Sequence, residues 1–504
     1  MVMQYVSDAF GFLANPSAII VVVLSVFIGL VFGMLPGLTA TMAVALLTGL
    51  TYKFDGMLAI LSLLGVYIGS ISGGCQAAIL LNIPGTPASA ATAVEGYTLA
   101  KQGKGGLAIF VANASSFFGT LIAIICLLFL TPAITSIALK FNAQEMFLLS
   151  VFGVVICGGL ASNGNALKGW ISGFLGLFVA MIGRDVVDSV ARYSFGNINL
   201  SAGISLLPVM IGLFGLPEIV TAFNYKAREI IPMSKFSVKE GFQVVWKNKF
   251  NILRSGLLGM TMGAIPGVGE DTGGWLSLWA AKTFSKNKEL WGKGNIEGVV
   301  AAEAGNNGAV GGAIIPVLSL AVPGSAPAAV LLAAFWMHGY RPGPLLMKDT
   351  PEFLYYVVVF MVVASIVMWI LAFLVSKISV KILQVDPRIL MPIIFICCVV
   401  GAFVVNNRIF DCKVMLVFGV IGIIMRKLEF PAAPFLLGVV LGSMMDSNLR
   451  RALILTSGNL SSFFTRPISL FFVIFIVLLI IPQIPICKRG LNALIKRIFK
   501  SKEA

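Results

Sequence analysis

The sequence is short of charged residues and of histidine. Only 11% of its 504 residues are Asp, Glu, Lys or Arg, and it contains one His. An average soluble protein carries about a quarter charged residues, so a water-soluble globular fold is excluded. A single His without an Asp or Cys cluster beside it predicts no metal and no catalytic centre. The chain also lacks a GxxxxGK[ST] motif, so ATP is not its expected energy source.

Long apolar segments without charged residues make up much of the chain. Hydrophobic residues make up 58% of the chain, and the mean hydropathy is +0.97. No Asp, Glu, Lys or Arg occurs in 9–52, 56–94, 107–139, 304–340, 353–376 or 467–487. Because a helix needs about 20 residues to cross a bilayer, we expect an all-α polytopic membrane protein with about 11 or 12 transmembrane helices. The alternating segments of an outer-membrane barrel are missing.

The positive charge is unevenly distributed along the chain. The net charge is +15, and basic residues gather in 224–254 and after 487. Both segments are expected in the cytoplasm, while the first 52 residues hold no Lys or Arg, which places the N-terminus outside. We therefore expect a multi-pass membrane protein with a cytoplasmic C-terminus. Arg450 and Arg451 would then lie near the outer face, contrary to the tendency of Lys and Arg to lie on the cytoplasmic side.

The two halves of the chain carry similar Gly/Pro motifs in the same order. The matches are 32–38 with 262–268, 83–86 with 322–325, 96–97 with 339–340, Asn163 with Asn406, Gly176 with Gly419, and 208–212 with 434–438. An odd number of spans per copy would make the copies inverted repeats. We divide the chain into a first membrane repeat (1–223), a basic cytoplasmic linker (224–253), a second membrane repeat (254–455), and an extra C-terminal transmembrane helix with a basic cytoplasmic tail (456–504).

Two Pro-Gly motifs interrupt uncharged runs and suggest broken helices or re-entrant hairpins. Each is followed by a hydroxyl residue, Thr86 or Ser325, that is placed to cap a new helix. A helix N-terminus offers free N–H groups and positive potential to an anion. Candidate substrate-binding residues are Asn82, Pro84, Gly85, Thr86, Asn306, Asn307, Pro323, Gly324 and Ser325. The alternative is that the motifs are ordinary kinks or loops between spans.

Polar residues near two further Pro-Gly motifs, at 36–37 and 266–267, suit either a coupling cation or a helix cap. Thr39 and Thr41 follow the first motif, and Glu270 and Asp271 follow the second. Glu303 joins these candidates because ionisable groups at membrane depth are costly and usually functional. Glu303 and Asn307 are four residues apart, so they share a helix face. Asn306 and Asn307 either contact the substrate or hydrogen bond between helices.

These motifs resemble those of the TctA family, the large membrane subunit of the tripartite tricarboxylate transporters. The likeness runs from about residue 20 to 455 and includes 36–47 (PGLTATMAVALL), 81–87 (LNIPGTP), 191–196 (ARYSFG), 263–267 (GAIPG), 292–298 (GKGNIEG), 302–307 (AEAGNN), 322–325 (VPGS) and 338–345 (HGYRPGPL). The resemblance implies a secondary active importer of di- or tricarboxylates or related organic anions. It also implies two partners: a small membrane subunit and an extracytoplasmic solute-binding protein.

Two segments depart from the family pattern and leave the substrate and the coupling ion open. Cys75 and Gln76 stand where the family has Ser and Ile, and the segment at 270–272 is more acidic than expected. No cofactor is expected beyond a coupling ion, Na⁺ or H⁺. We expect an elevator-like movement, from resemblance to other inverted-repeat anion transporters. Alternatives are a stand-alone organic-anion symporter without a binding protein, a channel, or an intramembrane enzyme, for which the apolar runs lack an Asp pair.

Overall fold

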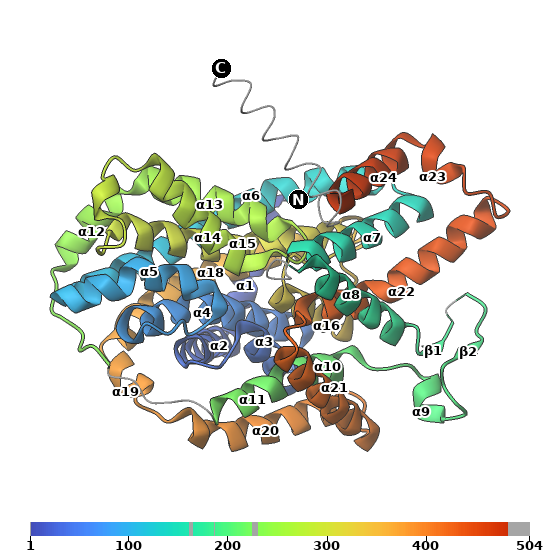
Figure 1. Cartoon of the computed structure of the whole chain (residues 1–504), viewed down its shortest axis with the longest axis horizontal. Helices are drawn as coiled ribbons and strands as arrows, with labels where there is room; N and C mark the ends of the chain where they lie inside the picture. Colours follow the sequence, from blue (N-terminus) through green and yellow to red (C-terminus); the bar gives the residue numbers. More distant parts are fainter. Residues whose placement is uncertain (1, 161–164, 186, 224–229, 482–504) are drawn as a thin grey trace. The chain divides into compact units, whose positions relative to one another are not determined.

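The protein is almost wholly helical. The computed structural model describes residues 2–160, 165–185, 187–223 and 230–481 (Figure 1). The α-helices are α1 (Val2–Leu13), α2 (Pro16–Met34), α3 (Ala40–Leu50), α4 (Gly56–Leu81), α5 (Ala90–Leu99), α6 (Gly105–Ala138), α7 (Ala143–Leu160), α8 (Ala166–Ala180), α9 (Ile198–Ser201), α10 (Leu206–Met210), α11 (Leu216–Ala222), α12 (Val238–Lys247), α13 (Lys249–Ala264), α14 (Gly269–Phe284), α15 (Ile296–Leu320), α16 (Ala326–Met337), α17 (Leu346–Asp349), α18 (Glu352–Ser376), α19 (Ser379–Leu383), α20 (Pro387–Val404), α21 (Ile409–Lys427), α22 (Ala432–Leu455), α23 (Ser462–Thr465) and α24 (Pro467–Ile480).

Short irregular elements join these helices. Segments η1 (Pro87–Ser89) and η4 (Lys288–Leu290) are 3₁₀-helical, and η2 (Ala100–Lys104) and η3 (Ile211–Gly215) are π-helical. Strands β1 (Gly183–Arg184) and β2 (Ala191–Arg192) form an antiparallel pair. The all-α class is confirmed.

Membrane-spanning length and apolar composition coincide in several helices. Within the described ranges, five helical segments are long and apolar enough to cross a bilayer, and seven shorter apolar helices accompany them. The five long segments are fewer than the expected 11 or 12 transmembrane helices, and which of the shorter helices cross the membrane stays a prediction. The chain is a multi-pass membrane protein. Asn163, part of the linker (224–229) and the basic tail lie outside the described residues.

The chain forms two compact units, and each is discontinuous in sequence. The first contains Met1–Leu139 and Ser205–Ile424, and the second contains Lys140–Ile204 and Met425–Ala504. Each unit therefore takes segments from both halves of the sequence. The compact units are defined by which helices pack together, whereas the proposed repeats are defined by sequence similarity between the two halves. The units therefore do not test the repeat boundaries, which stay a prediction.

Glycine contacts in the first unit hold α2 against α4 and α13 against α15 in the same way. A Cβ added at Gly33 would lie 2.1 Å from the carbonyl oxygen of Ser70, and one added at Gly263 would lie 2.1 Å from that of Ala309. The paired positions are offset by 263 − 33 = 230 and 309 − 70 = 239 residues. Close backbone approach of this kind is how membrane helices pack without a hydrophobic driving force.

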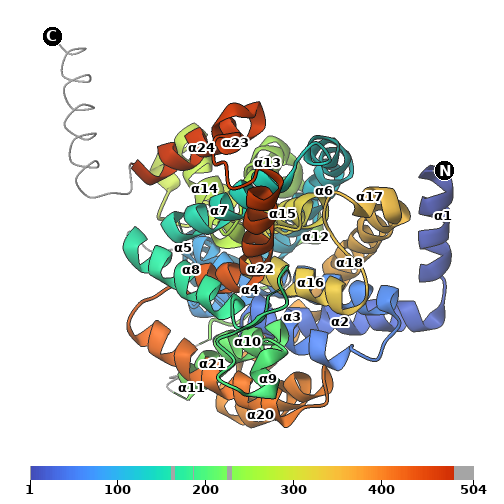
Figure 2. The same ribbon diagram turned by 90° about the vertical axis from the view of Figure 1, so that its right-hand side faces the viewer.

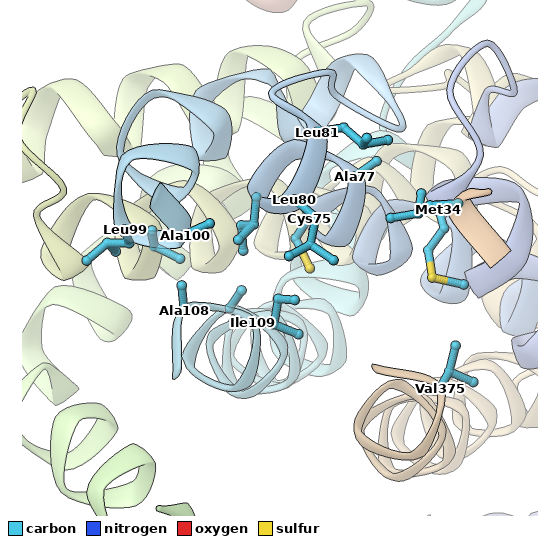
Figure 3. Packing of buried hydrophobic residues seen from close by; sticks show 14 residues of the cluster. Met34, Cys75, Ala77, Leu80, Leu81, Leu99, Ala100, Ala108, Ile109 and Val375 are labelled. Carbon is cyan, nitrogen blue, oxygen red and sulfur yellow. The ribbon is translucent and has the colours of Figure 1, made fainter. Parts of the chain in front are cut away.

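Apolar side chains complete the core of the first unit. Figure 3 shows Leu80 and Cys75 of α4 facing Ala108 and Ile109 of α6, all within a buried cluster. In Figure 2, α1 stands beside α2 and α18, and the rings of Tyr5 and Tyr355 stack there with centroids 5.6 Å apart.

The second unit combines α7 and α8 with α22 and α24. A Cβ at Gly438 of α22 would lie 2.2 Å from the carbonyl oxygen of Gly173 of α8. The matching position in the first unit is Gly212. A Cβ added there would lie 2.2 Å from the carbonyl oxygen of Met415. The last helix of each half thus packs on a helix of the other half, which explains why both units are discontinuous.

Candidate functional site

Both long helices α4 and α15 end in the left-handed conformation at matching positions. Asn82 follows α4 with φ 55°, and Ala321 follows α15 with φ 56°. Their offset, 321 − 82 = 239, equals that between Gly85 and Gly324. Asn tolerates this conformation better than Ala does, and one residue of this kind is enough to end a helix. The sequence therefore stops both helices just before its Pro-Gly motifs.

The Pro-Gly turns that follow are packed in the same way in both halves. A Cβ at Gly85 would lie 1.9 Å from the carbonyl oxygen of Gly33, and one at Gly324 would lie 1.9 Å from that of Gly263. No side chain fits at either glycine because the neighbouring atom is backbone. We call residues 82–86 the first break and residues 321–325 the second break. They are structurally alike.

The two hydroxyl residues after the turns behave differently. Ser325 caps α16, since its Oγ accepts a hydrogen bond of 3.3 Å from the amide of Ala328. Thr86 stands before η1 but makes no such bond. Its hydroxyl lies instead toward Gly74, where a Cβ would be 2.6 Å from Thr86 Oγ1. The predicted capping is therefore correct for Ser325 and wrong for Thr86, whose buried Oγ1 has no hydrogen-bond partner among the described residues.

The breaks also differ in exposure. Asn82 is exposed and Pro84 is half-buried, whereas Pro323 and Gly324 are buried. In this conformation the first break is therefore the more accessible of the two.

Glu303 lies at the centre of a buried polar cluster between α15, α5 and α6. Its side chain is fully buried. The hydroxyl of Thr92 donates to Glu303 Oε1, and that of Ser116 donates to Oε2 over 2.9 Å. The amides of Asn306 and Asn307 add weaker contacts of 3.3 and 3.4 Å to the same carboxylate. Four donors therefore surround one carboxyl group.

The same cluster ties the first break to the second half of the chain. Asn306 Nδ2 donates to the carbonyl oxygen of Ala88, in η1, over 3.0 Å. Asn307 Oδ1 accepts from Ser72 Oγ of α4 over 2.6 Å. The structure therefore brings Asn306, Asn307 and Glu303 together beside η1, three residues beyond Gly85.

A second buried carboxylate, Glu270, lies at the second break. Its Oε1 accepts from the hydroxyl of Ser325 over 2.8 Å and from the hydroxyl of Tyr67. The neighbouring Asp271 is exposed and caps no helix, since α14 begins after Val268 without a side-chain cap. Glu270 therefore joins the second break and Asp271 stands apart from it.

Thr39 and Thr41 belong to the start of α3. Thr39 Oγ1 accepts from the amide of Met42 over 3.2 Å, so the capping expected of Thr39 is correct. Thr41 is buried, with 6% of its surface exposed, and no hydrogen bond of its side chain joins it to either carboxylate. Neither residue reaches the two carboxylate clusters.

Sequence reasoning did not single out Thr92 and Ser116 as partners of Glu303, or Tyr67 as the partner of Glu270. The signal for Tyr67 was its place in the small polar stretch 67–76, which matches the stretch that holds the Asn pair. Thr92 and Ser116 offered only a hydroxyl within an uncharged run, a pattern that many membrane helices share.

The site combines buried carboxylates with hydroxyl and amide groups within apolar helices. Broken helices at depth are tolerated where they line a cavity or lie buried in protein. No Lys or Arg falls within either break. Among the described residues no group of three metal-ligating side chains is found. Paired breaks of this kind in a multi-pass protein are typical of membrane transporters.

Comparison with known proteins gives the family. The model of the "Tripartite tricarboxylate transporter TctA family" matches residues 19–437, and the chain belongs to that family. This is a family of transporter components that work in tripartite systems and not a family of enzymes. The recognition made from the sequence motifs is confirmed.

Relatives of this chain occur in Agrobacterium vitis. One, an "Uncharacterized 52.8 kDa protein in TAR-I ttuC' 3'region", is 33% identical over 459 residues, which cover 90% of this chain and 91% of the relative. Another, an "Uncharacterized protein in TAR-II ttuC' 3'region", is 33% identical over 211 residues, covering 42% of this chain and 87% of the relative. No solved structure matches the chain.

Proposed function

We propose that this chain is the large membrane subunit of a cation-coupled importer of di- or tricarboxylates or related organic anions. A small membrane subunit and an extracytoplasmic solute-binding protein would complete the system. Substrate carboxylates would bind between the two breaks, and the chain would be a symporter of a bacterial or archaeal inner membrane. The N-terminus would lie outside and the C-terminus in the cytoplasm, as the distribution of Lys and Arg suggests.

One observation carries this proposal: the two breaks are built alike. The left-handed residues Asn82 and Ala321 and the glycine contacts at Gly85 and Gly324 recur at the same offset. Each break is followed by a helical segment whose free amides and positive dipole end favour an anion. Paired breaks in two halves are the expected sign of a transporter site built by inverted repeats.

The electrostatics of the breaks support coupling to a cation. Glu303 lies beside the first break and Glu270 at the second, and both are buried. A carboxylate at depth repels an anionic substrate unless a cation neutralises it. Cation binding would therefore precede or accompany substrate binding, which is what a symporter requires. An elevator-like movement of the part that carries the breaks would then change the side from which the site is reached.

The proposal is tested by transport in proteoliposomes that hold this chain with its small subunit, with the binding protein added outside. Labelled citrate and labelled succinate serve as probes. We expect uptake that needs an ion gradient and counterflow that needs only substrate on both sides. Substituting Asn307 with Ala removes an amide beside Glu303 and should abolish uptake while leaving expression intact. If Asn307→Ala and Asn82→Ala both took up substrate normally, the proposed site would be wrong.

The alternatives separate in the same assay. A stand-alone symporter would transport citrate at full rate without binding protein. A channel would show conductance that does not saturate with substrate and does not depend on the gradient of a second ion. Paired breaks with polar groups at depth favour a transporter over a channel, because a channel needs a continuous open path.

A further inference from the structure

The two buried carboxylates are not equivalent, because Glu303 is surrounded by donors. Thr92 and Ser116 donate their hydroxyls to it, and Asn306 and Asn307 donate their amides. A Na⁺ ion needs the lone pairs of several oxygens, as hard cations do. Here the amide nitrogens point at the carboxylate, and the Asn307 oxygen already accepts from Ser72. The arrangement offers a cation few free lone pairs.

A proton fits this arrangement because Ser116 has two acceptors within reach. Its Oγ lies 2.9 Å from Glu303 Oε2 and 3.0 Å from the carbonyl oxygen of Ala112. When Oε2 carries a proton, Glu303 donates to Ser116 Oγ, and the Ser116 hydroxyl turns to donate to Ala112. Every donor keeps an acceptor in both states, so no buried polar group is left unpaired by the change.

Among the residues that the structure describes, no Lys or Arg forms an ion pair with Glu303, and Lys249 of α13 and Lys282 of α14 lie near the ends of their helices. The spans of α6 and α4 hold no Lys or Arg. Glu95 of α5 is bound to backbone amides, and Glu270 and Asp271 of α14 are acidic. Arg254 of α13 contacts Asn251 over 2.5 Å. A permanent charge left without an opposite charge at depth is costly, and taking up a proton removes it.

We propose that Glu303 is the proton-binding site of the transporter and that the coupling ion is H⁺. This inference rests on the proposed function, which does not specify the coupling cation, and it identifies that cation as H⁺. One proton from water binds to Glu303 Oε2 on the side from which substrate enters. It leaves to water on the other side after the substrate is released. The step moves one proton, and no covalent bond other than O–H is made or broken. Ser116 is a positioning residue that accepts the hydrogen bond of the protonated acid.

The test uses the complete system in proteoliposomes, with labelled citrate and succinate as probes and Na⁺ absent. An acid exterior should drive wild-type accumulation, and a protonophore should abolish it. Glu303→Gln cannot exchange a proton, so we expect it to lose accumulation and to show counterflow that no longer varies with pH. Glu303→Asp keeps an acid and should restore the pH dependence. Ser116→Ala should shift the pH profile of counterflow, whereas Thr120→Val should not.

Thr120 is a matched control because it lies one turn along α6 and its hydroxyl donates only to the carbonyl oxygen of Ser116, over 2.9 Å. A measurement that needs no substrate accompanies the transport assay. Infrared spectra of the purified complex, titrated with acid, should show a carboxylic C=O band that is absent from Glu303→Gln and present in Thr120→Val.

Two results would overturn the inference. One is wild-type accumulation driven by a Na⁺ gradient at equal pH on both sides. The other is an infrared titration, or accumulation in a pH gradient, that is the same in Glu303→Gln as in wild type. If the wild type shows no counterflow of citrate or succinate, the proposed function fails instead, and the infrared titration still decides whether Glu303 binds a proton.

Discussion

Tyr67 and Asn306 occupy the same position of the two long helices, and each contacts the other half of the chain at its break or just after it. The offset is 306 − 67 = 239 residues, as at the breaks themselves. The Tyr67 hydroxyl lies 3.0 Å from Ser325 Oγ, and Asn306 Nδ2 lies 3.0 Å from the carbonyl oxygen of Ala88. Each half therefore contacts the other half at or beside its break through one polar side chain. This exchange links the two halves of the chain next to both breaks.

Removing the Tyr67 hydroxyl should weaken the second break. Tyr67→Phe deletes a hydrogen bond to the buried Glu270 carboxylate, and a bond to a charged group contributes about 1.5–3 kcal/mol. We expect a lower thermal unfolding midpoint in detergent and an altered KM for citrate counterflow. Tyr356→Phe is the control, since its hydroxyl makes no hydrogen bond within the described residues. An equal effect of both substitutions would mean that the Tyr67 contact does not matter.

The glycines of the two breaks should tolerate no methyl group. Gly85→Ala and Gly324→Ala each place a Cβ 1.9 Å from a backbone oxygen, which must move. Overpacking of this kind costs about 1–3 kcal/mol, and the breaks would shift with it. Thermal unfolding should show the loss of stability in both variants, and transport should fall sharply. Gly11→Ala, where nothing lies within 4 Å, is the control and should unfold like wild type.

The parts of the site that depend on local sequence were predictable. Pro-Gly motifs mark the breaks because a proline just after a helix end cannot continue that helix. Glu303 and Asn307 share a face because of helical periodicity. What the sequence hides is contact between distant segments. Tyr67 meets Glu270 across 203 residues, and Thr86 turns toward α4 rather than capping η1. The discontinuous compact units escape prediction for the same reason, because helices of one half pack on helices of the other.

Asn82 has two separable roles, and substitutions can tell them apart. It holds a left-handed conformation, with φ 55°, and it presents an exposed amide at the first break. Asn82→Gly keeps the backbone and removes the amide, so we expect normal stability and a higher KM. Asn82→Ala also strains the backbone by about 1–2 kcal/mol and should lower the unfolding midpoint. If Asn82→Gly has the wild-type KM in counterflow, the amide does not contact the substrate.

Glu95 fastens the loop that leads into α15. Its carboxylate accepts from the backbone amides of Gly292, Gly294 and Asn295 over 2.7, 3.0 and 2.8 Å. Glu95→Gln turns one acceptor oxygen into a donor that faces these amides, so the loop should detach more often. The measurement is the rate at which a maleimide modifies Lys293→Cys, and we expect it to rise. Glu289→Gln, an exposed change in the neighbouring η4, should leave this rate unchanged; an equal rise would point to general loosening.

Asp185 anchors the β1–β2 hairpin of the second unit, and its ionisation should make the hairpin sensitive to acid. The backbone amide of Asp188 holds the pKa of Asp185 below its usual value, with help from the amide of Val187 and from the Arg192 and Arg450 guanidinium groups. A lowered pKa in the folded state means that the carboxylate stabilises the fold at neutral pH. This contribution is complete above the unfolded value, about 3.9, and is lost as the pH falls through the lower folded value.

The measurement for this hairpin is the mobility of a spin label at Val190→Cys, an exposed position between the strands. We expect a constant, restricted spectrum from neutral pH down to about 4, the usual pKa of an Asp, and rising mobility in stronger acid. Asp185→Asn cannot bind a proton and should be mobile already at neutral pH, with little further change in acid. A label that is equally restricted in both proteins at neutral pH would show that the Asp185 contacts do not hold the hairpin in place.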